Sequence, residues 1–268
     1  MLPFSKAHAY GNDFLYVRAA DLEGREYGPA AIRLCDRHTG IGADGLIIYG
    51  PTQRGASMTL HNADGGKAEL SGNGLRGLAA LIVRERERQG RDARSVVEIQ
   101  TTAALRTLQL TSVDGPHYVF EADMGQPAGI HETRLGAAGE FVTATVLTMG
   151  NPQLVVLGPL PSDERFARLG PALERHAEFP AGTNVEFAEV ESPGRVRIRI
   201  WERGVGPTES SGTGSCAAAV AAAAHGGAAR RVEVIAPGGS QVVEWTEAGV
   251  RLIGWAEIIC DGTFEPAL

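Results

Sequence analysis

Alternating apolar and polar residues recur along this chain and predict a protein rich in strands. Short runs of this kind, bounded by glycine, proline, asparagine or aspartate, are typical of β-strands. Two of the runs follow a Gly-Asn pair, and two others precede a glycine-rich loop. The expected strands are residues 14–17, 58–60, 96–99, 105–110, 154–157, 196–200, 232–235 and 241–245.

Three segments have helical rather than strand character. Residues 75–86 and 216–224 are rich in alanine, leucine or arginine in place of β-branched runs, and a glycine follows each. A third segment, 163–176, is polar and amphipathic and begins after Ser162, a suitable N-cap. Together with the strands, these helices predict a mixed α/β (α+β) fold.

An internal repeat accounts for the order of these elements. Shifted by 140 positions, residues 60–79 align with residues 200–219 without a gap, and six aligned positions are identical. The identical positions include the serine and both glycines of a Ser-Gly-x-Gly segment. This segment begins at Ser71 in the first block and at Ser211 in the second.

Two further pairs of segments keep this spacing within one residue. Tyr10-Gly-Asn-Asp pairs with Met149-Gly-Asn-Pro, and Gly42-Ala-Asp pairs with Gly182-Thr-Asn. Three separated segments in register indicate a duplication. Because Asp114-Gly-Pro is a turn sequence, we expect the halves to divide there. The expected halves are residues 1–115, completed by the C-terminal segment 260–268, and residues 116–259.

Composition and charge narrow the possible partners. Of 268 residues, 43% are hydrophobic and 21% charged, which is typical of a globular protein with its own core. The net charge is -7, and the arginine-rich stretch 84–94 is interleaved with acidic residues, so no nucleic-acid partner is expected. The start does not resemble a signal peptide and no apolar run approaches the roughly 20 residues that span a bilayer, so no membrane contact is expected.

The cysteines and histidines predict neither a disulfide framework nor a metal site. The chain has an odd number of cysteines without CxxC spacing: Cys35, Cys216 and Cys260. Its seven histidines form no metal-binding motif. A cytoplasmic location agrees best with this pattern. Cys216 lies within a predicted helix and is expected to be a buried small residue.

The two Ser-Gly-x-Gly turns are candidate anion sites. Each lies where a strand should end and a helix begin, so unpaired N–H groups and the positive end of the helix dipole meet there. Glycine is expected because a ligand must approach the backbone and because left-handed dihedrals are expected. The turns lack the spacing of nucleotide-binding loops, which favours a smaller anion such as a carboxylate. Ordinary N-capping by Ser71 and Ser211 remains an alternative.

Polar residues at strand and loop ends around the turns could orient an amino acid. Asparagines in such places are usually turn formers, but four at repeat-related positions could also orient ammonium and carboxylate groups. An adjacent acid–base pair suits a zwitterion, or forms a structural ion pair. These residues are Asn12, Asn62, Asn151, Asn184, Glu202 and Arg203.

These segments strongly resemble those of the diaminopimelate epimerase family, and the resemblance covers the whole chain. Motifs this long, in this order, are highly specific for the fold and less specific for the substrate. They are Lys6-Ala-His-Ala-Tyr-Gly-Asn-Asp-Phe, Asp36-Arg-His-Thr-Gly-Ile-Gly-Ala-Asp-Gly, Asn62-Ala-Asp-Gly-Gly, Ser71-Gly-Asn-Gly, Met149-Gly-Asn-Pro, Gly182-Thr-Asn-Val, and Glu202-Arg-Gly-Val-Gly through Ser211-Gly-Thr-Gly.

The resemblance implies a fold and an activity. The fold would have two pseudo-symmetric halves, each a mixed sheet or barrel curled around a central helix, with the substrate between them. The activity would be that of an isomerase without a cofactor, independent of pyridoxal phosphate, converting LL- to meso-diaminopimelate in lysine biosynthesis. The partner would be a small-molecule amino acid, and a homodimer is common among enzymes of this kind.

The resemblance also assigns residues to the site. Asn12, Asn62, Asn151, Asn184, Glu202 and Arg203 would hold the distal amino and carboxyl groups or line the site. The backbone N–H groups of Gly72, Asn73, Gly212 and Thr213 would bind the carboxylate at the reacting carbon.

The catalytic positions depart from the family. There, a cysteine begins each glycine turn, and one thiolate removes the α-proton while the other thiol delivers a proton to the opposite face. Here these positions are Ser71 and Ser211, and a family histidine two residues after the Met-Gly-Asn asparagine is Gln153. A hydroxyl is a far weaker acid than a thiol with a pKa of about 8.5, so two serines are poor bases.

Three interpretations follow from this departure. In a working isomerase, the serines keep the two-faced geometry while Glu69, Glu209, Asp64 or His61 relays the proton. In an engineered form, both cysteines have been replaced by serine to capture an inactive ligand complex, although such a double substitution does not explain Gln153. In a non-catalytic amino-acid-binding protein, the cleft is kept and the chemistry lost. The many retained motifs favour a diverged or inactivated epimerase-like enzyme.

Overall fold

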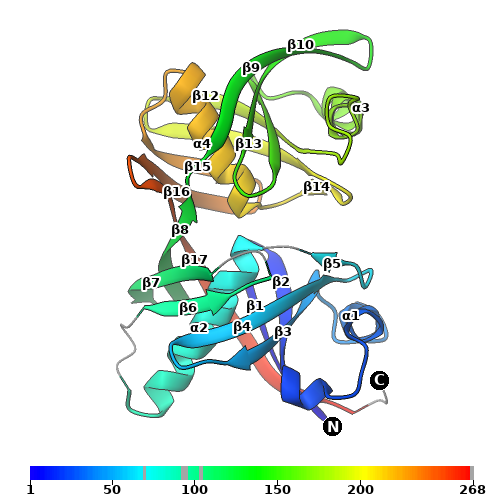
Figure 1. Ribbon diagram of the computed structural model, residues 1–268, viewed down its shortest axis with the longest axis vertical. Coiled ribbons are helices and arrows are strands. Elements are labelled where there is room, and N and C mark those ends of the chain that lie inside the picture. Colours follow the sequence, from blue (N-terminus) through cyan, green and yellow to red (C-terminus); the bar gives the residue numbers. More distant parts are fainter. Residues whose placement is uncertain (69–70, 92–95, 103–104, 266–268) are drawn as a thin grey trace. The chain divides into compact units, whose positions relative to one another are not determined.

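The chain forms two compact α/β units. The computed structural model describes residues 1–268 except 69–70, 92–95, 103–104 and 266–268. Unit 1 comprises Met1–Ala122 and Gly254–Leu268, and unit 2 comprises Asp123–Ile253 (Figure 1). In the described part of the chain, no helix is long and apolar enough to cross a membrane.

The first unit is a mixed sheet around one long helix. Two of its strand pairs, β2–β3 and β4–β6, are parallel, whereas β1–β2, β3–β4, β6–β7 and β7–β8 are antiparallel. Its elements are β1 (Leu2–Ala9), β2 (Asn12–Arg18), η1 (Ala19–Leu22), α1 (Tyr27–Cys35), β3 (Gly45–Pro51), β4 (Gly55–Asn62), β5 (Lys67–Ala68), α2 (Gly72–Arg88), β6 (Val97–Gln100), β7 (Leu105–Asp114) and β8 (His117–Gly125).

The second unit repeats this pattern strand by strand. Here β11–β12 and β13–β15 are parallel, and β10–β11, β12–β13, β15–β16 and β16–β17 are antiparallel. The pseudo-symmetric halves expected from the repeat are thereby confirmed. The elements are β9 (Ala128–Ala137), β10 (Glu140–Thr148), β11 (Pro152–Leu157), α3 (Asp163–Glu174), β12 (Asn184–Ser192), β13 (Arg195–Glu202), β14 (Gly206–Thr208), α4 (Gly212–His225), β15 (Arg231–Ala236), β16 (Gly239–Thr246) and β17 (Gly249–Phe264).

The chain passes between the units within strands rather than at a turn. Asp114-Gly-Pro, where the division was expected, is the hairpin between β7 and β8, with Asp114 paired to His117. The crossings lie within β8, after Ala122, and within β17, after Ile253. A turn sequence marks the end of a strand but carries no information about which core the next strand joins.

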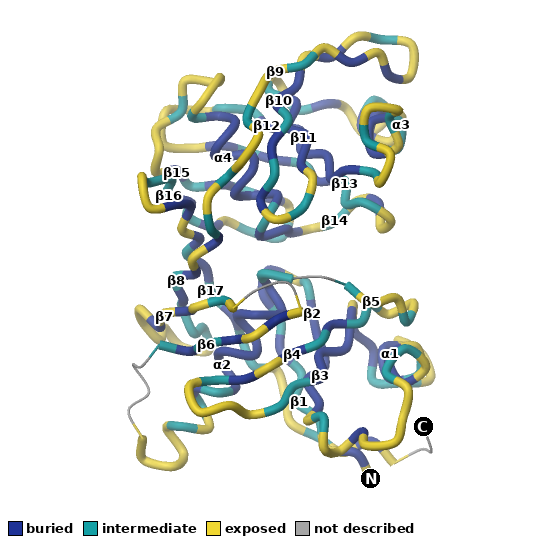
Figure 2. The backbone as a smooth tube through the Cα atoms, viewed as in Figure 1, coloured by how far each residue is buried: buried dark blue, intermediate teal, exposed yellow. Residues whose placement is uncertain are grey.

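The central helices are buried because strands surround them. α2 packs against β1, β2 and β6, and α4 packs against β11, β12 and β16. α4 is buried at Gly212 and continuously over 214–222, and buried residues gather on these helices and their strands in Figure 2. A helix that is apolar on every side is a core helix, and its many alanines keep the strands close. Cys216 is among the fully buried residues, as expected.

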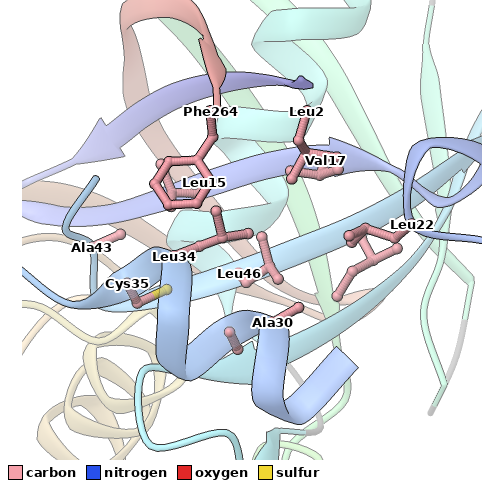
Figure 3. Close-up of a cluster of buried hydrophobic side chains, with 12 residues drawn as sticks. Leu2, Leu15, Val17, Leu22, Ala30, Leu34, Cys35, Ala43, Leu46 and Phe264 are labelled. Carbon is pink, nitrogen blue, oxygen red and sulfur yellow. The ribbon is translucent and has the colours of Figure 1, made fainter. Parts of the chain in front are cut away.

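A smaller core in each unit lies beneath an outer helix. In unit 1, Leu34 and Cys35 of α1 pack with Leu15 and Leu46 of the strands (Figure 3). In unit 2, Phe166 and other apolar residues of α3 form the corresponding core. Of these two outer helices, only α3 was expected, from its amphipathic pattern and from Ser162. In the structure, Ser162 caps α3 by accepting a hydrogen bond from Arg165 N.

Elements without local sequence signals were not predicted. α1 begins Tyr27-Gly-Pro and has no side-chain cap, so its start has the composition of a turn. The strands that were not predicted are β1, β3, β5, β8, β9, β10, β12, β14 and β17, whereas all eight expected strands and all three expected helices are present.

Close packing between α2 and β2 makes Gly77 a sensitive position. A Cβ there would lie 2.8 Å from Tyr16 Cζ and closer still to its hydroxyl, which is buried and donates to Gly74 O at 3.0 Å. We expect Gly77→Ala to lower the free energy of unfolding by about 1–3 kcal/mol, because overpacking outweighs the gain of roughly 1 kcal/mol in helix propensity.

Urea denaturation checks this expectation. Gly194→Ala is the control, because no atom outside its chain neighbours lies within 4 Å of its Cβ position, and it should leave stability unchanged or slightly higher. A Gly77→Ala protein as stable as the parent would contradict the packing of Tyr16 against α2.

Candidate functional site

Both Ser-Gly-x-Gly segments form the first turn of a central helix. Ser71 and Ser211 are N-caps in extended conformation, with φ and ψ of -132° and 119°, and -140° and 125°. Their hydroxyl oxygens accept from the N–H groups of Gly74 and Gly214, each at 3.1 Å. The first N–H groups of a helix have no partner within it, so each turn directs donors and the positive dipole end to one place.

The last glycine of each turn is required by packing, not by a left-handed backbone. Gly74 and Gly214 lie inside α2 and α4, so the expectation of left-handed dihedrals is wrong. A Cβ on Gly74 would lie 2.7 Å from Ile47 Cδ1, and one on Gly214 would lie 2.6 Å from Glu186 Oε1. The helix starts therefore contact the strands more closely than an alanine would allow.

In unit 1, the structure brings Asn12 and Asn73 together. Asn73 Nδ2 donates to Asn12 Oδ1 at 3.2 Å, and Asn12 Nδ2 donates to Asp44 Oδ2 at 2.8 Å. Asn73 Oδ1 in turn accepts from Arg76, which is fully buried. The start of β2 is thereby joined to the first turn of α2.

A partly exposed ionic cluster, centred on the buried carboxyl of Asp13, supports this arrangement. Asp13 contacts Lys6 at 2.9 Å and Arg37 at 2.8 Å, and Arg37 also contacts Asp44. Burial alone would raise the pKa of Asp13, but hydrogen bonds from Arg37 and Lys6 outweigh it and hold that pKa below its usual value. Asp13 therefore stays a carboxylate at neutral pH.

Asn62 and the candidate relay groups lie around the turn between β4 and β5. Asn62 is paired with Gly45 across β3 and β4, and its backbone N donates to Gly66 O at 2.9 Å. His61 Nδ1 lies 3.0 Å from Gly65 O, and Asp64 Oδ1 accepts from Gly66 N at 2.8 Å. Both side chains thus help to form this turn. Glu69 lies outside the described residues.

In unit 2, the side chains of Gln153 on β11 and Asn184 on β12 contact the chain segments beside them. Asn184 Oδ1 accepts from Arg203 N at 2.9 Å, and its amide nitrogen lies 3.4 Å from Pro152 O. Gln153 Nε2 donates to Asn151 Oδ1 at 2.8 Å. Ser211 Oγ lies 3.5 Å from Thr213 Oγ1.

The Glu202-Arg203 pair lies at the end of β13, of which Glu202 is the last residue. The Arg203 guanidinium lies 3.3 Å from Ala181 O, so it also braces the loop before β12. Glu202 acts on a second carboxyl, Glu186, through its charge. Glu209, another candidate relay group, accepts from Gly238 N through its backbone oxygen at 2.8 Å.

Glu186 is a functional candidate that the sequence did not reveal. It lies on β12 and is fully buried, with its carboxyl against Gly214. Burial raises the pKa of Glu186 well above its usual value, and the charge of Glu202 acts in the same direction. The only sequence signal was an acid between two apolar residues in the segment Asn184-Val-Glu-Phe, which a half-exposed strand would also show.

Loss of the capping hydroxyl of Ser71 or Ser211 should lower stability, and the cap Ser162 provides a control. Ser71→Ala and Ser211→Ala should each lower the free energy of unfolding by about 1 kcal/mol, and Ser162→Ala, at the start of α3, should do the same. Only the first two should also weaken carboxylate binding, because only they leave the N–H groups of a glycine turn less fixed.

Denaturation and titration calorimetry with L,L-diaminopimelate measure both effects. Equal loss of binding in Ser162→Ala would show that binding follows general stability rather than the turns. Unchanged stability in Ser71→Ala and Ser211→Ala would contradict the capping role.

Comparison with known proteins gives the family. The model of the family "Diaminopimelate epimerase" matches residues 4–129 and 145–258. The diaminopimelate epimerase of Desulforudis audaxviator is 41% identical over 97% of this chain and 98% of its own, and that of Bacteroides thetaiotaomicron is 36% identical over 98% of both.

Solved structures show the same fold at low sequence identity. A predicted epimerase from Pseudomonas aeruginosa superposes with a TM-score of 0.77 at 15% identity, over all of both chains. A hydroxyproline epimerase from Agrobacterium vitis gives a TM-score of 0.69 at 16% identity, over 97% of this chain and 90% of its own. With the family model and these relatives covering nearly its whole length, the chain belongs to the diaminopimelate epimerase family.

Proposed function

We propose that this chain binds an amino acid through both glycine turns and is a cofactor-independent epimerase acting at the α-carbon. The observation that carries the proposal is the twofold occurrence of one structure: a Ser-Gly-x-Gly helix start that is capped by its serine. The names of its relatives make diaminopimelate the expected substrate, in a route to lysine.

The turns supply the anion stabilisation that such a reaction needs. Removal of an α-proton moves negative charge onto the neighbouring carboxylate. N–H groups at a helix start, already oriented, stabilise that charge without rearrangement. Those of Gly72, Asn73, Gly212 and Thr213 are the proposed donors.

The remaining site residues are proposed to hold the far end of the substrate. Asn12 and Asn184 are already fixed by Asp44 and by the Arg203 backbone, so they can select an orientation at low entropic cost. Asn62, Asn151, Glu202 and Arg203 complete the set of groups that suit an ammonium and a carboxylate.

The serines provide geometry rather than basicity. In inversion, one group must take the α-proton from one face while another delivers a proton to the opposite face, so the count of protons on the substrate is unchanged. Ser71 and Ser211 both use their oxygens as caps, and a hydroxyl gives a negligible alkoxide fraction at neutral pH. Thiols at the same helix starts would have lowered pKa values.

The capping hydrogen bonds also favour a second candidate, a non-catalytic amino-acid-binding protein. In that case, the turns would bind the ligand and no proton would leave the α-carbon. The two candidates differ in one observable, the exchange of that proton with solvent.

A cytoplasmic location, a homodimer and the lack of a nucleic-acid partner are further parts of the proposal. Free thiols at Cys35, Cys216 and Cys260 suit a reducing compartment, and a net charge of -7 does not favour nucleic acid. Closed twofold dimers are the commonest assemblies of soluble enzymes.

Proton exchange tests the proposed activity. The protein is incubated with L,L-diaminopimelate in deuterium oxide, and the α-proton signal is followed by NMR. Loss of the signal together with appearance of the meso form supports the epimerase. Saturable binding without exchange supports the binding protein instead, and no binding at all overturns both.

Restoring the thiols separates lost bases from a changed pocket. Ser71→Cys/Ser211→Cys should accelerate inversion by about a hundredfold or more, the usual contribution of positioned acid–base groups. Each single cysteine variant should exchange a proton on one face with little inversion, and Ser162→Cys is the control for an added thiol at a helix start. A folded double variant that binds the substrate but remains inert would contradict the proposal.

A further inference from the structure

The two halves differ sharply at one pair of equivalent strand positions. Phe14 pairs with Gly45 across β2 and β3, as Gln153 pairs with Asn184 across β11 and β12. Two residues beyond those partners stand Ile47 in unit 1 and Glu186 in unit 2. Where the first half has the apolar residues Phe14 and Ile47, the second half therefore has the polar residues Gln153 and Glu186.

The polar pair lies directly behind the Ser211 turn. Glu186 Oε1 is 2.6 Å from the position that a Cβ on Gly214 would take, and Glu186 Cδ and Ser211 Cβ are each 3.2 Å from it. In the first half, the corresponding position beside Gly74 is occupied by the Ile47 methyl group. The carboxyl thus occupies the place of a hydrocarbon contact.

Stability does not explain this exchange. Glu186 and Gln153 are both fully buried, and burial of an acid and an amide is unfavourable compared with well-packed hydrocarbon. The first half shows that the fold accepts hydrocarbon there. A costly buried polar pair next to a helix start suggests a function.

Two orientations are open to the Gln153 amide, and each leaves one mismatch. In one, Nε2 donates to Asn151 Oδ1 at 2.8 Å, and the amide oxygen faces the Glu186 carboxyl at 3.1 Å, but Nε2 faces the Asn184 amide nitrogen at 3.2 Å. This orientation needs a protonated Glu186, which can donate to the amide oxygen.

After a half turn of the amide, Nε2 donates to both Glu186 oxygens at 3.1 Å. The amide oxygen then accepts from Thr213 Oγ1 at 3.3 Å and Asn184 Nδ2 at 3.2 Å. Now the mismatch is with Asn151, whose oxygen lies 2.8 Å from that of Gln153. This orientation suits an ionised Glu186 and requires the Asn151 amide to turn as well.

The geometry points to Glu186 as a positioning residue of the second glycine turn, whose protonation sets the direction of the Gln153 amide and, through it, that of Asn151. With Glu186 neutral, Asn151 keeps its NH2 group available for a ligand carboxylate. With Glu186 ionised, Asn151 must give its NH2 to Gln153. The inference deepens the proposed function, since it rests on Asn151 and Thr213 facing the ligand.

The groups around Glu186 fix the sign of the effect. Glu202 from β13 adds a like charge, Gln153 faces it from β11, and α4 contributes the turn at Gly214. Because the pKa of Glu186 is raised, the folded protein holds a proton that the unfolded chain has released above the usual glutamate pKa. Stability should therefore fall as pH rises from the usual glutamate pKa to the raised pKa of Glu186 in the folded protein. Affinity for a carboxylate should fall as Glu186 ionises in the folded protein.

NMR of the whole chain tests the coupling without any assay of activity. Carboxyl ¹³C and side-chain amide ¹⁵N signals are followed across pH, with Glu186→Gln and Gln153→Leu used for assignment. We expect Glu186 to titrate above the usual glutamate range, and the amides of Gln153 and Asn151 to shift with the same midpoint. In Glu186→Gln, neither amide should move with pH.

A variant that carries the residue types of Phe14 and Ile47 at positions 153 and 186 is the matched control. Gln153→Phe/Glu186→Ile should fold, and its affinity for L,L-diaminopimelate should lose its pH dependence, whereas in the parent it should fall by about tenfold across the Glu186 midpoint, a common size for coupling between two sites. Should this double variant fail to fold, Glu186→Gln gives the same comparison.

Two results would overturn the inference. One is a Glu186 titration that leaves the Gln153 and Asn151 amides unmoved, and the other is an unchanged pH dependence of binding in Glu186→Gln. Failure of the parent to bind any amino acid would instead count against the proposed function, while the NMR titration would still decide the coupling.

Discussion

The structure depends on one constraint: a helix surrounded by strands can meet solvent or ligand only at its ends. The flanks of α2 and α4 are taken up by their sheets. Their first turns therefore carry the only unpaired backbone donors that such a helix can offer. A serine fixes each turn by capping, and a glycine lets the helix start approach the strand behind it. Anion binding follows from this arrangement before any catalytic residue is considered.

Because the fold is duplicated, the chain has two such helix starts, but the residues around them differ. In unit 1, the turn is backed by hydrocarbon and joined to a fixed ionic cluster through Asn12. In unit 2, it is backed by a buried acid and an amide. This chain has serine at both helix starts, so the two starts differ in what lies behind them.

The sequence predicted the central helices, which belong to the repeat, and those elements that have a local signal such as an N-cap. The shared Ser-Gly-x-Gly blocks predicted both central helices, and Ser162 predicted α3, while the family resemblance is confirmed by relatives over nearly the full length. α1 was missed because Gly28-Pro29 resembles a turn, and the unit boundary because a hairpin was taken for a division. Glu186 was missed because an acid in a strand looks solvent-exposed until three-dimensional packing buries it. The roles of the twelve candidate site residues stay predictions.

Backbone ¹⁵N chemical shifts during a titration with L,L-diaminopimelate test the central claim most directly. If both helix starts bind one substrate molecule, the amides of Gly72, Asn73, Gly212 and Thr213 should all shift and saturate together at a stoichiometry of one. Shifts confined to one helix start, separate saturation of the two, or no shift at either would contradict the account.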